Sequence, residues 1–133
     1  MENKIDLTAW DLDAGASKLE LDELSRNMAF VLPQDYLDFL ATHNGGEGFV
    51  GDNYLVIWKA EELIAFNADY QVAEFAPGIF LFGSDGGGEG YGFDFRAENV
   101  PVVRIPFVGM DVEYADEISE SFEKLWFVLK DEQ

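Results

Sequence analysis

The residues best placed for recognition chemistry lie in one glycine-rich stretch, Ser84 to Asp94. Two carboxylates, Asp85 and Glu89, flank the run Gly86-Gly87-Gly88, and no Lys, Arg or His occurs from residue 60 to residue 95. Glycines of this density exclude a helix and favour a turn with positive φ, which we expect at Gly87 or Gly88. The stretch therefore predicts a surface loop, over residues 86–90, that offers negative charge to a positively charged partner.

Catalytic chemistry has less support in the sequence. His43 is the single histidine, so a hydrolase would have to use it with carboxylates, or in a triad with Ser84 and Asp85. The position of His43 in line with Tyr36 and Phe39 instead favours a structural role, and no GxSxG motif surrounds Ser84. We predict a protein that is not an enzyme, with the hydrolase kept as an alternative.

Two further motifs fail when their context is considered. Residues 46–51 match GxGxxG, but they follow a predicted helix end instead of a strand, so we expect a plain loop and no nucleotide cofactor. The carboxylates of Asp85, Glu89 and Asp94 suggest calcium, but the EF-hand register places Arg96 where a bidentate Glu is required. The expectation is a protein without a cofactor or a metal.

The composition indicates an acidic globular protein. The 133 residues carry 27 acids against 8 Lys and Arg, for a net charge of −19, and the acids are spread along the chain. Such a charge argues against nucleic acid and anionic membranes as partners and favours rapid association with a basic protein. Cysteine is absent, and neither a signal peptide nor an apolar run of membrane-spanning length is recognisable, which predicts a cytoplasmic location.

The hydrophobic pattern predicts helices at both ends and short strands between them. Ser17-x-x-Glu20 fits a capping box for a first helix, and Pro33 fits the start of a second helix that stops at Asn44-Gly45-Gly46. A last helix is expected to bury Ile118, Phe122, Leu125, Trp126 and Leu129, with Glu117 and Glu120 near its start. Residues 60–66 suggest a short helix, and strands are expected at 54–58, 79–82, 91–95 and 102–105. We predict one compact α+β domain over residues 1–133, a mainly antiparallel sheet flanked by helices.

Three segments resemble the SUKH superfamily. They are Leu32 to Leu40 running into His43-Asn44-Gly45-Gly46, the stretch Ile79 to Asp94, and Ser121-Phe122-Glu123. The resemblance implies an α+β domain without catalytic activity, and in many bacterial members an immunity protein that binds and neutralises a toxin. The chain departs from the family pattern at Ser25, where glutamate is frequent, and at Ala29, where glycine is common.

The charge and the resemblance lead to one hypothesis, a cytoplasmic immunity protein that binds a basic, nuclease-type toxin domain stoichiometrically. The alternative is a general interaction or scaffold module whose charge only keeps it soluble. Asp85 and Glu89 are the leading candidates for contacts with the partner. Carboxylates on neighbouring segments follow them, namely Glu47, Asp52, Asp111 and Glu113.

Overall fold

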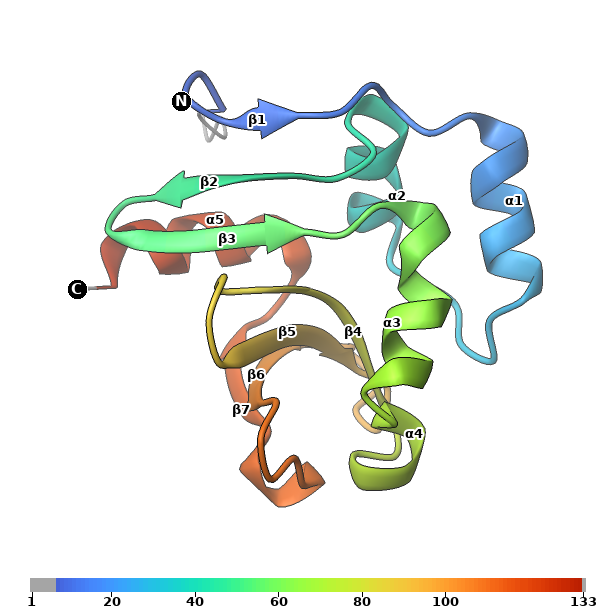
Figure 1. Cartoon of the computed structure of the whole chain (residues 1–133), viewed down its shortest axis with the longest axis vertical. Helices are drawn as coiled ribbons and strands as arrows, with labels where there is room; N and C mark the ends of the chain where they lie inside the picture. Colours follow the sequence, from blue (N-terminus) through green and yellow to red (C-terminus); the bar gives the residue numbers. More distant parts are fainter. Residues whose placement is uncertain (1–6, 133) are drawn as a thin grey trace.

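The fold is built on one antiparallel sheet whose strands are neighbours in the order of the sequence. The computed structural model describes residues 7–132, and in this range the sheet has seven strands in the order β1-β2-β3-β4-β5-β6-β7 (Figure 1). The strands are β1 (Asp11–Leu12), β2 (Gly46–Val50), β3 (Asn53–Ile57), β4 (Ile79–Ser84), β5 (Glu89–Asp94), β6 (Val102–Pro106) and β7 (Asp116–Ser119). The predicted α+β class and antiparallel sheet are confirmed.

The helices fill the connections and the C-terminal end of the described chain. They are α1 (Lys18–Arg26), α2 (Gln34–Thr42), α3 (Leu63–Asp69), α4 (Val72–Phe75) and α5 (Phe122–Asp131), with 3-10 turns at η1 (Ala60–Glu62) and η2 (Val112–Tyr114). The capping box predicted for α1 is present, since Ser17 Oγ accepts from the Glu20 amide at 3.1 Å and the Ser17 amide donates to Glu20 Oε1 at 2.8 Å. Pro33 was predicted to be the first residue of the second helix. In the structure it is the residue immediately before α2, which begins at Gln34.

The prediction of a plain loop over residues 46–51 was wrong, because residues 46–50 form β2 and pair along their whole length with β3. The inward-facing positions of β2 include Gly48, which carries no apolar side chain to mark a strand. A Cβ at Gly48 would clash with the ring of Trp10, so the indole from a distant segment fills that place in the core. The sequence pattern of β2 alone could not show this.

The last helix begins later than predicted. Ser121 caps α5 by accepting from the Lys124 amide at 3.1 Å, so the helix starts at Phe122. Ile118 and Glu117 lie in β7 instead, and Glu120 precedes the cap. Phe122, Leu125, Trp126 and Leu129 are buried as predicted. The apolar residue Ile118 fits helical spacing by coincidence, because the cap at Ser121 separates it from the stripe.

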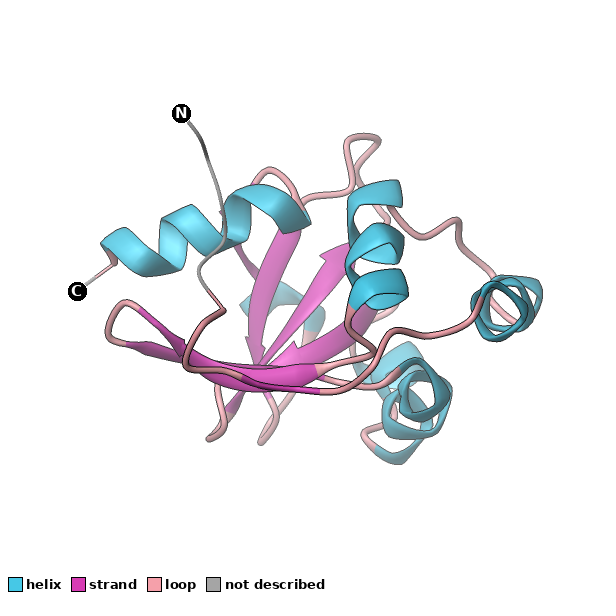
Figure 2. Ribbon diagram, turned by 90° about the horizontal axis from the view of Figure 1, so that it is seen from above, coloured by secondary structure: helices cyan, strands magenta, loops and turns pink. Residues whose placement is uncertain are grey.

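The main core lies between the sheet and the pair α2 and α5, which Figure 2 shows on the same side of the curved sheet. Its centre is an aromatic cluster in which the ring of Tyr36 lies 5.5 Å from Phe82, 5.1 Å from Phe93 and 5.2 Å from Phe122 between centroids. These four residues come from α2, β4, β5 and α5. The cluster therefore joins all three segments of the predicted family resemblance.

Candidate functional site

Strand alternation brings three connections to one end of the sheet. Because neighbouring strands are antiparallel, the β2–β3 turn at 51–52, the β4–β5 loop at 85–88 and the β6–β7 connection at 107–115 all lie at that end. The twist of the sheet fans these connections out, from the left of Figure 1 to the orange segment at the bottom. Five of the six predicted contact carboxylates are found here, and we call them the acidic end: Asp52, Asp85, Glu89, Asp111 and Glu113.

The central connection is organised by Asp85 itself. Its Oδ1 accepts from the Gly87 amide at 2.8 Å and from the Glu89 amide at 3.2 Å, while its own amide donates to the Glu89 carbonyl at 3.0 Å. One carboxylate oxygen of the leading candidate is thus used within the loop. Asp85 has a structural role as well as a charge, so replacing it with lysine would alter the loop.

The glycines of this loop differ from the prediction. Gly86 has φ of +80°, whereas Gly87 and Gly88 are not among the residues with positive φ. The expectation of positive φ at Gly87 or Gly88 was therefore wrong, because the chain reverses at Gly86, directly after Asp85. The Gly88 carbonyl accepts from the Phe107 amide at 2.9 Å, which connects the loop to the start of the β6–β7 connection.

Glu47 lies on β2 and reaches the same region through Tyr54. The Tyr54 hydroxyl donates to Glu47 Oε2 at 2.6 Å, and this hydrogen bond raises the pKa of Tyr54 above its ordinary value. A Cβ built on Gly86 would lie 3.0 Å from Tyr54 Cδ2. Glu47 is therefore separated from the β4–β5 loop by a single aromatic ring.

The remaining predicted residues flank the loop on its two sides. Asp52 is exposed in the β2–β3 turn. The next residue, Asn53, donates from its side chain to the carbonyls of Leu129 and Glu132 at 2.8 and 3.2 Å, which anchors the turn on the end of α5. Asp111 and Glu113 are exposed at η2, where Asp111 Oδ1 accepts from the Glu113 amide at 2.9 Å.

No ion pair among residues 7–132 neutralises the charge of the acidic end. Ion pairs between described residues are Lys18–Asp22, Lys59–Asp13, Arg96–Asp94, Arg104–Glu132 and Lys124–Glu120. Within residues 7–132, none of them includes Glu47 or a residue of the acidic end. Arg104 lies on β6, but its guanidinium is directed to Glu132, at 3.2 Å. A positively charged partner would therefore meet carboxylates that no ion pair of the described chain engages.

Asp94, which the sequence suggested as a calcium ligand, has a structural function. It is buried, and both its oxygens accept from the Arg96 guanidinium, at 2.9 Å from Nε and 2.8 Å from Nη2. These hydrogen bonds hold the pKa of Asp94 below its ordinary value. Across residues 7–132, no group of three or more His, Cys, Asp and Glu is arranged to hold a metal ion.

The residues considered for hydrolysis are not assembled. His43 caps the end of α2, with its ring centroid 5.8 Å from that of Phe39, and Ser84 Oγ accepts from the Gly86 amide at 3.1 Å. In the described part of the chain, no hydrogen bond or ion pair joins the His43 ring to Ser84 or to a carboxylate. Likewise, none of the helices in this part is long and apolar enough to span a membrane.

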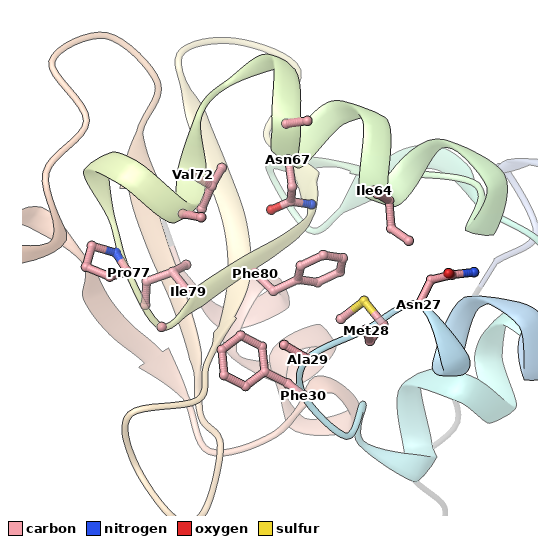
Figure 3. Close-up of a pocket in the computed structure, with 13 residues that line it drawn as sticks. Asn27, Met28, Ala29, Phe30, Ile64, Asn67, Val72, Pro77, Ile79 and Phe80 are labelled. Carbon is pink, nitrogen blue, oxygen red and sulfur yellow. The ribbon is translucent and has the colours of Figure 1, made fainter.

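A separate pocket of about 520 Å³ lies between α3 and the segment that joins α1 to α2. Figure 3 shows Met28, Phe30, Ile64 and Phe80 around it, with Asn67 on its α3 side. Ala29, one of the two departures from the SUKH pattern, also lines it. No sequence pattern indicates this pocket, because its walls come from segments up to about fifty residues apart.

The family model that matches the chain is the SMI1 / KNR4 family (SUKH-1), over residues 15–126. The match covers most of the 133 residues and includes all of the acidic end. The chain belongs to the SUKH-1 family. The predicted resemblance is thereby confirmed. No curated protein matches the chain.

Proposed function

We propose that this SUKH-1 protein is a non-catalytic immunity protein that neutralises a basic toxin domain by stoichiometric binding. The observation that carries the proposal is the acidic end, where three connections and the adjoining start of β5 present carboxylates that no ion pair of the described residues neutralises. A nuclease must bind phosphate and so exposes Lys and Arg around its substrate site. An acidic surface on a stable scaffold is complementary to such a site.

The net charge of −19 supports the same partner through kinetics. Long-range attraction raises the association rate of oppositely charged proteins, by about ten- to a thousandfold at low ionic strength. Short-range contacts then set the dissociation rate. An inhibitor that must meet its toxin before damage occurs benefits from the first of these effects.

The test is to co-purify the chain with any toxin domain that a neighbouring gene encodes, and then to measure stoichiometry and inhibition. We expect one chain to bind each toxin domain and abolish its activity. The association rate should fall at least tenfold between about 50 and 500 mM NaCl, as the Debye length shrinks from roughly 14 Å to about 4 Å. An unchanged toxin activity at saturating chain would contradict the proposal and favour the scaffold module.

Variants that remove charge while keeping the size of the side chain test which residues contact the partner. Asp85→Asn with Glu89→Gln removes two charges, while the carboxamide oxygen introduced at position 85 can still accept from the Gly87 amide; the double variant should slow association. Glu23→Gln with Glu98→Gln is the matched control, since both carboxylates are exposed and lie outside the acidic end. Equal loss from both pairs would show that total charge steers the encounter and that the β4–β5 loop is not the contact.

A further inference from the structure

The face of β1, β2 and β3 that points away from α5 carries a set of residues fixed by the strand register. Asp11 is opposite Glu47, Glu47 is opposite Val56, and Phe49 is opposite Tyr54. Directly paired residues point to the same side of a sheet, as do alternate residues of one strand. We call these five residues the aromatic sheet face: Asp11, Glu47, Phe49, Tyr54 and Val56.

The aromatic sheet face is uncovered in the described structure. Figure 1 shows α5 behind β2 and β3, and Figure 2 places α2 on that same far side. Phe49 remains 65% exposed, although phenylalanine is normally buried. Leu55 and Ile57 point to the other face of β3, and they are 0% and 2% exposed. The exposed aromatic therefore lies on the one side of these strands that the helices leave open.

The rings and carboxylates of this face are held in fixed relative positions. Phe49 and Tyr54 pack edge to face, with centroids 5.0 Å apart and an interplanar angle of 78°. The hydroxyl of Tyr54 is bound to Glu47, which fixes the carboxylate beside the rings. An aromatic face with an adjacent anion is the arrangement in which a guanidinium both stacks and forms a charge-assisted hydrogen bond.

The surroundings extend the negative charge. A hollow of about 220 Å³ adjoins the face, and Asp11, Glu47, Asp13 and Glu62 line it together with one cation, Lys59. The Lys59 ammonium is 4.0 Å from Asp13, at the limit of an ion pair. Four carboxylates against one ammonium leave the hollow negative, so its charge complements a basic side chain.

We propose that the aromatic sheet face binds an arginine side chain of the basic partner protein, with the guanidinium against Phe49 and Tyr54 and paired with Glu47. The proposal rests on the proposed function and adds the surface and the residue type that it recognises. The face adjoins the acidic end, since Tyr54 contacts the β4–β5 loop at Gly86. Asp11 lies before the residues matched by the family model, which begin at residue 15.

The experiment is an NMR titration of the whole chain with a capped tri-arginine peptide and, separately, with a capped tri-lysine peptide. The arginine peptide should shift the backbone amide signals of residues 47, 49, 54 and 56. Phe49→Ala should weaken its binding about two- to fivefold, the equivalent of a cation–π contact at an exposed site. Glu47→Gln keeps an acceptor for Tyr54 and should weaken binding by a similar factor.

Matched controls separate this face from the general charge of the molecule. Phe75→Ala removes another exposed aromatic, and Glu23→Gln removes another exposed carboxylate; each should change the affinity less than twofold. Tri-lysine should bind more weakly than tri-arginine and should lose less affinity on Phe49→Ala, because an ammonium cannot stack on the ring as a planar guanidinium does. The proposal is wrong if the control variants lose as much as Phe49→Ala and Glu47→Gln. It is also wrong if sedimentation shows a dimer that Phe49→Ala dissociates, because the occupant is then a second copy.

The same variants keep this proposal distinct from the proposed function. If a toxin is inhibited and neither Phe49→Ala nor Glu47→Gln changes its affinity, the aromatic sheet face is the wrong surface while the immunity function stands. If tri-arginine binds as expected but no toxin is inhibited, the face is an arginine site and the immunity function fails.

Discussion

At the scale of single residues, the glycines of the β4–β5 loop have different functions. Gly86 adopts φ of +80° next to Tyr54, whereas a Cβ at Gly88 would meet no atom within 4 Å. Only the first position requires the conformational freedom of glycine. The density of glycine marks a loop here, but the predicted range of 86–90 was too long, because Glu89 and Gly90 pair within β5, where Gly90 lies opposite Ser84 and Ile105. Nor does glycine density identify the residue at which the chain turns.

This difference predicts the effect of two alanine substitutions. Gly86→Ala should lower the free energy of unfolding by about 1 kcal/mol or more, because an L-residue is strained in the left-handed region. Gly88→Ala should change it by less than about 0.5 kcal/mol. Urea denaturation of both variants measures the two values. Equal losses would show that Gly86 does not adopt the left-handed conformation in solution.

At the scale of elements, α3 protects the part of β4 that β3 leaves unpaired. β3 pairs with β4 only at Gly83 and Ser84. Nearer the start of β4, the Asn67 side chain takes the place of a neighbouring strand: it accepts from the Leu81 amide at 2.8 Å and donates to the Leu81 carbonyl at 2.9 Å. The same amide group donates to the Leu63 carbonyl at 2.8 Å. One side chain thus attaches α3 to the sheet and satisfies both polar groups of a buried strand residue.

Asn67→Ala should therefore be strongly destabilising. It leaves the amide and carbonyl of Leu81 without their partner, which should cost about 2–3 kcal/mol in the free energy of unfolding. Asn27→Ala is the control, since the Asn27 side chain makes one exposed hydrogen bond, to the Glu23 carbonyl at 2.9 Å. Thermal and urea unfolding compare the two. A loss at Asn67 no larger than at Asn27 would mean that water replaces the side chain at Leu81.

At the scale of the whole molecule, repulsion between carboxylates should dominate the electrostatics of folding. The net charge is −19, and several of the ion pairs are exposed, such as Lys18–Asp22, so they contribute little. Salt screens repulsion and attraction alike, but here the repulsion is larger.

Raising NaCl from about 20 to 500 mM should therefore increase the midpoint of thermal unfolding by several degrees. Scanning calorimetry at constant pH measures the effect, and sucrose in place of NaCl controls for general exclusion of cosolutes. A midpoint that falls with NaCl would show that the ion pairs outweigh the repulsion. In that case the net negative charge would not limit stability, and partner binding would be its only remaining role.

The sequence by itself determined the features that local chemistry controls. These include the capping box at Ser17, the start of α2 near Pro33 and the presence of a glycine-rich turn between two strands. Each depends on a residue's own backbone preference or on neighbours within about four positions. The order of the predicted helices and strands indicated the α+β class, and the ordered family motifs implied the same class.

Only the tertiary structure decided which residues meet across the sheet. β2 was not recognisable because Trp10 supplies the apolar group that Gly48 lacks. Phe49 and Tyr54 became candidates only when the strand register placed them on an uncovered face beside Glu47. Likewise, the acidic end formed because an antiparallel order returns every second connection to the same end of the sheet. These are contacts between distant segments, and their physical cause is the packing of the whole chain.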